Sequence, residues 1–258
     1  MLLKDFDTKT YITYFFFILI LSSCVSKKGV VYFQNAKDFE TIVDTNTFTP
    51  KLKVNDIISV YVSTFDLEAV EPFNLKKGQT DSGGLQYVDY LIDMDGNIDY
   101  PVLGKIKLLG LSVEQAKELL KEKLSDYLKD PIVNIRILNF RISVLGEVNS
   151  PGIYEVSGER ITLLEAIALA GDLKIKAKRE NVMVIRDFNG TKTYTRVNLT
   201  SKELFNSPVY FLTQNDVLYV EPNKSAITQA YFDGRVGAAI SIASVIITST
   251  VILLTRRN

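Results

Sequence analysis

Acidic residues gather in one short segment whose spacing could bind a cation. Four oxygen-bearing side chains alternate around Gly96, namely Asp93, Asp95, Asn97 and Asp99. An EF-hand calcium loop has its glycine at the sixth position and a glutamate at the twelfth, whereas Gly96 stands at the fourth position and the glutamate is missing. Asp-Gly between two alternating segments is a strong signal for a tight hairpin turn. We therefore interpret this segment as a turn, and we predict no metal site.

Other groups that support catalysis are scarce. The 258 residues include no histidine and one cysteine, which removes the commonest general base and metal ligand. Neither a phosphate-binding glycine loop nor a dinucleotide fingerprint is present. Glu147 lacks a carboxylate partner at any meaningful spacing, so we interpret it as a solvated turn residue. We expect no cofactor and no enzymatic activity, although composition alone leaves open a hydrolase that uses two carboxylates.

The charge balance argues against one class of partner. The chain has 30 basic and 30 acidic residues and therefore no net charge. No basic cluster occurs along it, whereas nucleic-acid binding requires one. We expect no nucleic-acid partner.

The single cysteine, Cys24, follows a segment typical of exported proteins. Lys4 and Lys9 precede an uncharged apolar run at 11–21, and two serines stand directly before Cys24. This order is typical of a secretory signal peptide, and its end resembles the site at which bacterial lipoproteins are cleaved and acylated. We predict a lipoprotein signal peptide at 1–23, lipid attachment at Cys24 and a tether at 24–45. The alternative is an uncleaved signal anchor with an incidental cysteine.

The carboxyl end contains a second apolar segment. Residues 236–254 are a run of 19 without a charge, and as a helix this run would be about 28 Å long, enough to cross a bilayer core. We predict a transmembrane helix at 236–254. A mild polar stripe lies on one face of it, made by Ser241, Ser244, Thr248 and Thr255.

The polar stripe has two interpretations. Its hydroxyls could bond back to carbonyls of the same helix, which would leave a simple lipid-facing anchor. Alternatively, several copies pack side by side through the small residues of the segment and turn the stripe toward each other or toward water. The sequence favours the second interpretation without excluding the first.

Between the two apolar ends lie two units that combine helices and strands. Alternating patterns predict strands in the first unit at 57–63, 87–92, 97–102 and 132–137, and a helix at 113–128. The second unit has predicted strands at 141–145, 182–186, 193–199 and 217–220, and a helix at 163–170. Ser112 with Gln115, and Thr162 with Glu165, have the spacing of helix capping boxes. The fold class is therefore α+β.

Several segments, in a fixed order, resemble a known family. Residues 55–60, 93–98, 100–104, 111–116 and 127–133 resemble the polysaccharide biosynthesis/export domain. Residues 144–148, 151–152, 161–166 and 170–171 resemble the soluble ligand-binding β-grasp (SLBB) domain that follows it. We predict an export domain at 46–139, an SLBB domain at 140–223 and a linker at 224–235.

The resemblance implies a lipid-anchored outer-membrane protein whose soluble domains lie in the periplasm. It implies a homo-oligomeric ring through which capsular or exopolysaccharide chains pass. It also implies an inner-membrane co-polymerase, often with a tyrosine-kinase domain, as a partner. Two alternatives stand beside this passive conduit: a membrane-tethered glycan-binding adaptor without a pore, and an enzyme that modifies the polymer. Arg256 and Arg257 after the apolar segment would also suit an inner-membrane tail.

Overall fold

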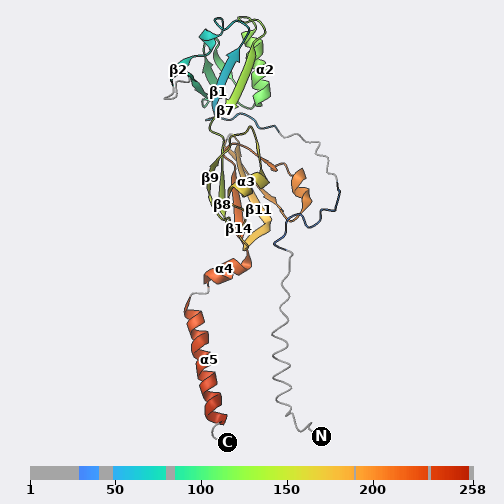
Figure 1. Cartoon of the computed structure of the whole chain (residues 1–258), viewed down its shortest axis with the longest axis vertical. Helices are drawn as coiled ribbons and strands as arrows, with labels where there is room; N and C mark the ends of the chain where they lie inside the picture. Colours follow the sequence, from blue (N-terminus) through green and yellow to red (C-terminus); the bar gives the residue numbers. More distant parts are fainter. Residues whose placement is uncertain (1–28, 41–48, 80–84, 189, 232–233, 256–258) are drawn as a thin grey trace.

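The chain folds into two domains stacked end to end. A computed structural model describes residues 29–40, 49–79, 85–188, 190–231 and 234–255. Figure 1 shows the first domain at one end of the molecule, the second domain beside it, and two helices that leave from the far end of the second domain. Each domain has its own hydrophobic core, and Ile137 packs against both cores. The junction between the domains is therefore a packed contact.

The first domain is built on a small antiparallel sheet. Strand β1 (Ile57–Ser63) lies between β4 (Asp89–Leu91) and β7 (Ile132–Ile137). Helix α2 (Val113–Leu124) packs against β7 and buries its apolar face in the core. Further pieces are the 3-10 helix η1 (Glu71–Phe73), the β2–β3 hairpin (Lys76–Gln79 and Leu85–Tyr87) and the β5–β6 hairpin (Asn97–Tyr100 and Gly104–Lys107).

The second domain is a five-stranded mixed sheet with one short helix. The strand order is β12-β11-β14-β8-β9, in which only the β14–β8 pair is parallel. The strands are β8 (Arg141–Gly146), β9 (Gly152–Glu155), β11 (Ala177–Phe188), β12 (Thr191–Val197) and β14 (Val217–Pro222). Helix α3 (Leu163–Leu169) covers the core side, together with β10 (Ile161–Thr162), β13 (Phe211–Leu212) and the 3-10 helix η2 (Lys202–Asn206).

Local signals place the helix starts correctly and the helix ends less well. Both predicted capping boxes form, at Ser112 with Gln115 and at Thr162 with Glu165. Helix α2 ends at Leu124, four residues before the predicted end at 128, because the chain turns there while Leu128 still reaches the core. Strand β11 is longer than the predicted 182–186 because β12 and β14 pair with it on both sides.

Part of the expected tether is bound to the second domain. Within residues 29–40, the backbone N–H of Phe33 donates to the carbonyl of Leu199 at 3.2 Å. The hydroxyl of Tyr32 donates to Asp172 Oδ1 at 2.5 Å. These contacts fix the segment before the first domain begins.

Two helices follow the second domain. Residues 224–235, expected to be a linker, contain helix α4 (Lys224–Tyr231), and α5 (Gly234–Thr255) covers the segment expected to span a membrane. In contrast to the transmembrane helix predicted at 236–254, none of the helices in the described part of the chain combines the length and the apolar character that a membrane crossing requires.

Candidate functional site at the domain junction

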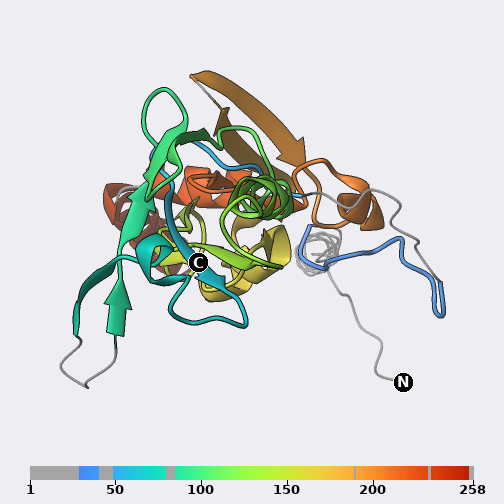
Figure 2. The same cartoon turned by 90° about the horizontal axis from the view of Figure 1, so that it is seen from above.

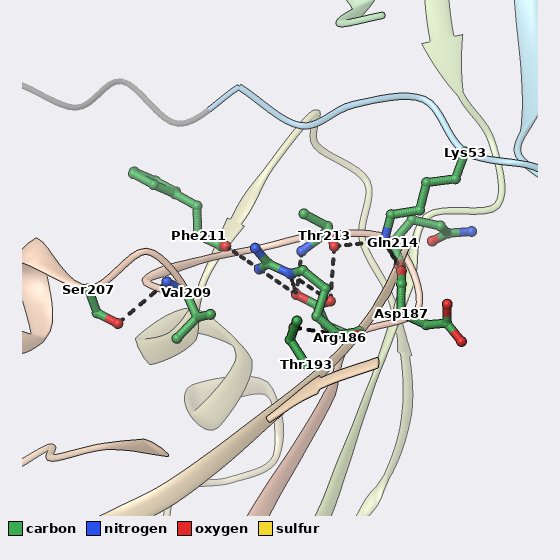
Figure 3. A network of polar contacts seen from close by, with 10 residues as sticks. Lys53, Arg186, Asp187, Thr193, Ser207, Val209, Phe211, Thr213 and Gln214 are labelled. Atoms are coloured by element: carbon green, nitrogen blue, oxygen red, sulfur yellow. Dashed lines mark hydrogen bonds and ion pairs between the residues drawn. The ribbon is translucent and has the colours of Figure 1, made fainter. Parts of the chain in front are cut away.

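The junction is organised by a buried lysine that enters the second domain from the first. Lys53 precedes β1, and its ammonium group donates to Asp187 O at 3.0 Å, Thr213 Oγ1 at 2.9 Å and Gln214 O at 2.9 Å (Figure 3). Three N–H donors thus meet three oxygen acceptors, which is the full capacity of an ammonium group. Because Lys53 is only 9% exposed, these bonds replace the water that the charge would otherwise bind.

A threonine hydroxyl bridges the ammonium group of Lys53 and a carboxylate. Thr213 Oγ1 accepts from Lys53 and donates to Asp216 Oδ1 at 2.9 Å. Asp216 also forms an ion pair with Arg186, with a distance of 2.7 Å between Nη2 and Oδ2. Burial lowers the pKa of Lys53, and the negative charge of Asp216 opposes that effect. A chain of hydrogen bonds and one ion pair therefore connects Lys53 of the first domain to the buried Asp216 of the second.

The short connection between the domains is fixed from both sides. Asn139 lies between β7 and β8, and its side chain accepts from the N–H of Ile57 at 2.9 Å and donates to Asn55 O at 2.9 Å. Its carbonyl accepts from Gln214 Nε2 at 2.6 Å. A linker whose polar groups bond to both domains resists rotation, because turning one domain would break these bonds together.

A second buried carboxylate lies on the first-domain side of the junction. Asp56 is 1% exposed, and its Oδ2 accepts from the N–H of Lys53 at 2.7 Å. Its Oδ1 has no hydrogen-bond partner among the described residues. Burial raises the pKa of Asp56 to about 6, partly offset by the Lys53 N–H bond and charge.

Two grooves flank the junction. One, of about 510 Å³, lies between β7 and the segment after β9, and Arg136, Glu155 and Glu159 are among its lining residues. The other, of about 580 Å³, is lined by Lys53 and Asp187 among others. These charged and amide groups can bind or position a polar ligand.

The structure places the sequence-predicted site residues as follows. Cys24 lies outside the described residues. In α5 the hydroxyls of Ser241, Ser244 and Thr248 donate to carbonyls of the same helix, at 3.0, 2.8 and 2.8 Å. The side chain of Thr255 lies outside the described part. The role of the polar stripe stays a prediction.

The acidic segment around Gly96 is a turn, but it is not the hairpin turn that the sequence indicated: β4 before it pairs with β1, and β5 after it pairs with β6. Asp93 Oδ1 accepts from the N–H of Asn97 at 2.7 Å, so this carboxylate holds the turn. Gly96 has a φ of +83°, and a Cβ there would lie 2.3 Å from Leu109 Cβ. Only glycine suits this position. Among the described residues, no three acidic or cysteine side chains are grouped so that they could hold a metal ion.

The junction residues were missed by sequence reasoning. From the sequence, Lys53 looks like an ordinary solvated lysine, because its acceptors are 134 to 161 positions away in the chain. A signal did exist: Asn-Asp stands directly before a strand in both domains, at 55–56 and at 215–216. Two equivalent turns with buried aspartates could have been suspected from this repeat.

Comparison with known proteins agrees with the two-domain division. Residues 45–138 match the family described as polysaccharide biosynthesis/export protein, and residues 141–196 match the SLBB domain. The chain is 32% identical over 89 residues to the EPS I polysaccharide export outer membrane protein EpsA of Ralstonia solanacearum. It is 31% identical over 87 residues to the protein of the same name from Ralstonia nicotianae.

The matched part covers 33% of this chain but only 24% and 23% of the two relatives. The chain therefore matches about a quarter of the length of these curated relatives. The export family and the two relatives are named for polysaccharide export and not for an enzymatic activity, in agreement with the expectation from the sequence. The chain thus contains, in the order expected from the sequence, a segment that matches the polysaccharide biosynthesis/export family and a segment that matches the SLBB domain.

Proposed function

We propose that this chain is a subunit of a passive, ring-shaped conduit through which polysaccharide leaves the cell at the outer membrane. The observation that carries the proposal is the domain order, an export domain followed at once by an SLBB domain. The two relatives, each named as a polysaccharide export outer membrane protein, support the same process and the same membrane. The cargo is a hydrated, flexible polymer, so the task needs a shaped passage and no catalytic group.

The fixed domain junction supports a role as part of a wall. A passage that guides a moving polymer has to keep its shape while the polymer pulls on it. Lys53 and Asn139 bond the two domains to each other at several points. Each subunit would therefore form one rigid segment of the ring wall.

The attachment that we propose has two parts, one to the membrane and one to the neighbouring subunits. Acyl chains on Cys24 insert into the outer membrane, and the contacts of Tyr32 and Phe33 transmit this attachment to the second domain. Helix α5 exposes large apolar side chains, among them Ile240, Ile242 and Val245, to be covered by neighbouring subunits in the assembly. The soluble domains then lie in the periplasm, where an inner-membrane co-polymerase with a tyrosine-kinase domain delivers the polymer.

A genetic experiment tests the export role. The gene is deleted, and surface polysaccharide and cell-retained polysaccharide are measured in the deletion strain and in strains that express the wild type or Cys24→Ser. We expect surface polymer to fall at least tenfold on deletion while retained polymer rises. Cys24→Ser should restore export only partly, although the protein accumulates. Unchanged surface polymer in the deletion strain would contradict the proposal.

The groove beside β7 favours a second candidate, the glycan-binding adaptor without a pore. Arg136, Glu155 and Glu159 at this groove could hydrogen-bond sugar hydroxyls. Calorimetric titration of the purified full-length protein with fragments of the cell's own polysaccharide separates the two candidates. Micromolar binding by a protein that stays monomeric at every concentration favours the adaptor, whereas a defined oligomer with weak binding favours the conduit.

A further inference from the structure

Within the described residues, the sheet of the second domain has two open edges, at β12 and at β9. All residues of β12 except Thr195 and Val197 are exposed. In Figure 2, which looks along the long axis of the molecule, the ribbon formed by β11 and β12 lies at the periphery. An exposed strand edge without proline is a template for another strand, so each edge can accept a partner.

The backbone groups that face outward can be assigned on both edges. The β11–β12 ladder closes at the Phe188–Thr191 pair across a two-residue connection, which makes that pair hydrogen-bonded and turns the backbone groups of Lys192 and Tyr194 away from β11. On the other edge, the N–H of Val156 donates to Phe140 O at 2.8 Å. Alternation along β9 then turns the backbone groups of its odd-numbered residues, 153 and 155, away from β8.

The outward residues of the two edges stand at the same level of the sheet. Tyr194 is opposite Ile185, and Ile185 is opposite Val217. Val217 is opposite Ser143, and Ser143 is opposite Ile153. One row of residues therefore crosses the whole sheet from Tyr194 on β12 to Ile153 on β9.

The strand directions also match. Following the pairings across the sheet, β12 is parallel to β14 and β8, and β9 is antiparallel to all three. A second copy placed beside the first without a shift along the strands would bring its β9 antiparallel to β12. In this register Ile153 lies opposite Tyr194, and Glu155 lies opposite Lys192.

These two pairs are chemically complementary. Ile153 and Tyr194 are 66% and 63% exposed and lie on the sheet face away from the core, and a β-branched residue opposite an aromatic one is a favourable cross-strand pair. Glu155 and Lys192 carry opposite charges. In the described part of the chain neither of them forms an ion pair. The contact would therefore gain a charge pair without breaking an existing one.

We propose that β12 of one subunit pairs with β9 of the next, so that the sheets of neighbouring subunits join edge to edge. The two surfaces are different, which makes the contact head-to-tail, and a head-to-tail contact closes into a ring when its rotation divides a full turn. The rotation between neighbours accommodates the twist of the sheet. The inference rests on the proposed ring, and it names the surfaces that build it.

Cross-linking tests the register. Ile153→Cys and Tyr194→Cys are introduced together and singly into the full-length protein, which is extracted in detergent and treated with a short reagent that links two thiols. The double variant should give a ladder of covalent multimers on a denaturing gel. Each single variant should give none, because its introduced thiol would face an unchanged tyrosine or isoleucine of the neighbouring subunit. A defined oligomer without the ladder would overturn the edge pairing and leave the ring intact.

A charge exchange tests the same contact without thiols. Glu155→Lys and Lys192→Glu should each raise the protein concentration for half-assembly, by about two- to fivefold per contact, as measured by analytical ultracentrifugation. The double exchange should restore assembly, since it recreates the pair with the charges reversed. If the double variant is worse than either single one, the pair does not exist. A strict monomer in the wild type would overturn the inference and the proposed ring together.

Discussion

Two turns with the same backbone geometry meet at the domain junction. Each contains a buried aspartate, but the two aspartates have different partners. The first turn, residues 53–56, comes before β1, and the second turn, residues 213–216, comes before β14. In each, the aspartate at the fourth position accepts from the N–H of the first residue at 2.7 Å. The asparagine at the third position has a φ near +65° in both, +67° for Asn55 and +63° for Asn215.

The difference lies in what surrounds the aspartate. Asp216 receives Arg186 and the hydroxyl of Thr213, so both carboxylate oxygens have charged or polar partners. In the part of the chain that the structure describes, the Asp56 carboxylate has only the bond from the backbone, and its second oxygen has no partner. Burial therefore raises the pKa of Asp56 to about 6.

The comparison teaches that the backbone turn and the buried charge are separate features. An Asn-Asp turn forms wherever its local hydrogen bonds can be made. Burial disfavours the charged form of an aspartate. Whether this cost in free energy is offset depends on a cation that another part of the fold places beside the carboxylate. In the second turn β11 supplies that cation, as Arg186, whereas in the first turn none of the described residues supplies one to the open oxygen.

The largest effect should follow from removal of the cation at the second turn. Arg186→Met leaves the Asp216 carboxylate buried without its ion pair, and breaking one side of a buried pair costs about 3–5 kcal/mol. Urea unfolding of the purified protein at pH 7.5 measures the loss. A loss below about 1 kcal/mol would mean that water already reaches Asp216.

A smaller effect is expected where the two turns touch. Lys53→Met removes three hydrogen bonds of a charged donor and leaves buried acceptors unsatisfied, at a cost of about 2–3 kcal/mol. Hydrogen exchange around Asn139 should also accelerate, because the junction loosens. Lys51→Met is the matched control: Lys51 is exposed, and its replacement should leave both readouts unchanged.

At the first turn, we expect a substitution to raise the stability of the protein and not to lower it. Asp56→Asn keeps an oxygen for the N–H of Lys53 and removes the buried charge, so we expect about 1–2 kcal/mol of added stability at pH 7.5. A carboxyl whose pKa is raised to about 6 contributes its full stability when protonated, below its ordinary pKa of 3.8, and loses it as the pH rises through 6. The gain of the variant should therefore vanish near pH 4.

Unfolding curves of wild type and Asp56→Asn between pH 4 and pH 8 check this sign. Asp216→Asn is the matched comparison at the second turn, and it should destabilise the protein at neutral pH because it leaves Arg186 without its carboxylate. Equal responses of the two aspartates would remove the distinction between the turns.

The smallest effect is expected for an ion pair at the surface. Arg196 and Glu221 pair at 2.7 Å, but the arginine side chain is 52% exposed. Arg196→Met should cost at most about 1 kcal/mol, since water screens exposed pairs. A cost similar to that of Arg186→Met would show that burial is not what separates the two arginines.

The fold was predictable where a structure depends on neighbouring residues. The turn at Gly96 and both capping boxes follow from a few adjacent side chains, and the structure contains them. The candidate site was not predictable in the same way. Lys53 is bonded to residues 134 to 161 positions away, which only the folded structure brings beside it.

The sequence by itself determined the domain order, the starts of the helices and the tight turns, because each depends on contacts within a few residues. Only the tertiary structure decided which aspartate obtains a cation, which lysine is buried and which strands are left at the edges of the sheet. The physical reason is that burial and long-range pairing set the energy of a charge and the availability of a backbone group. Neither is a property of a residue and its sequence neighbours.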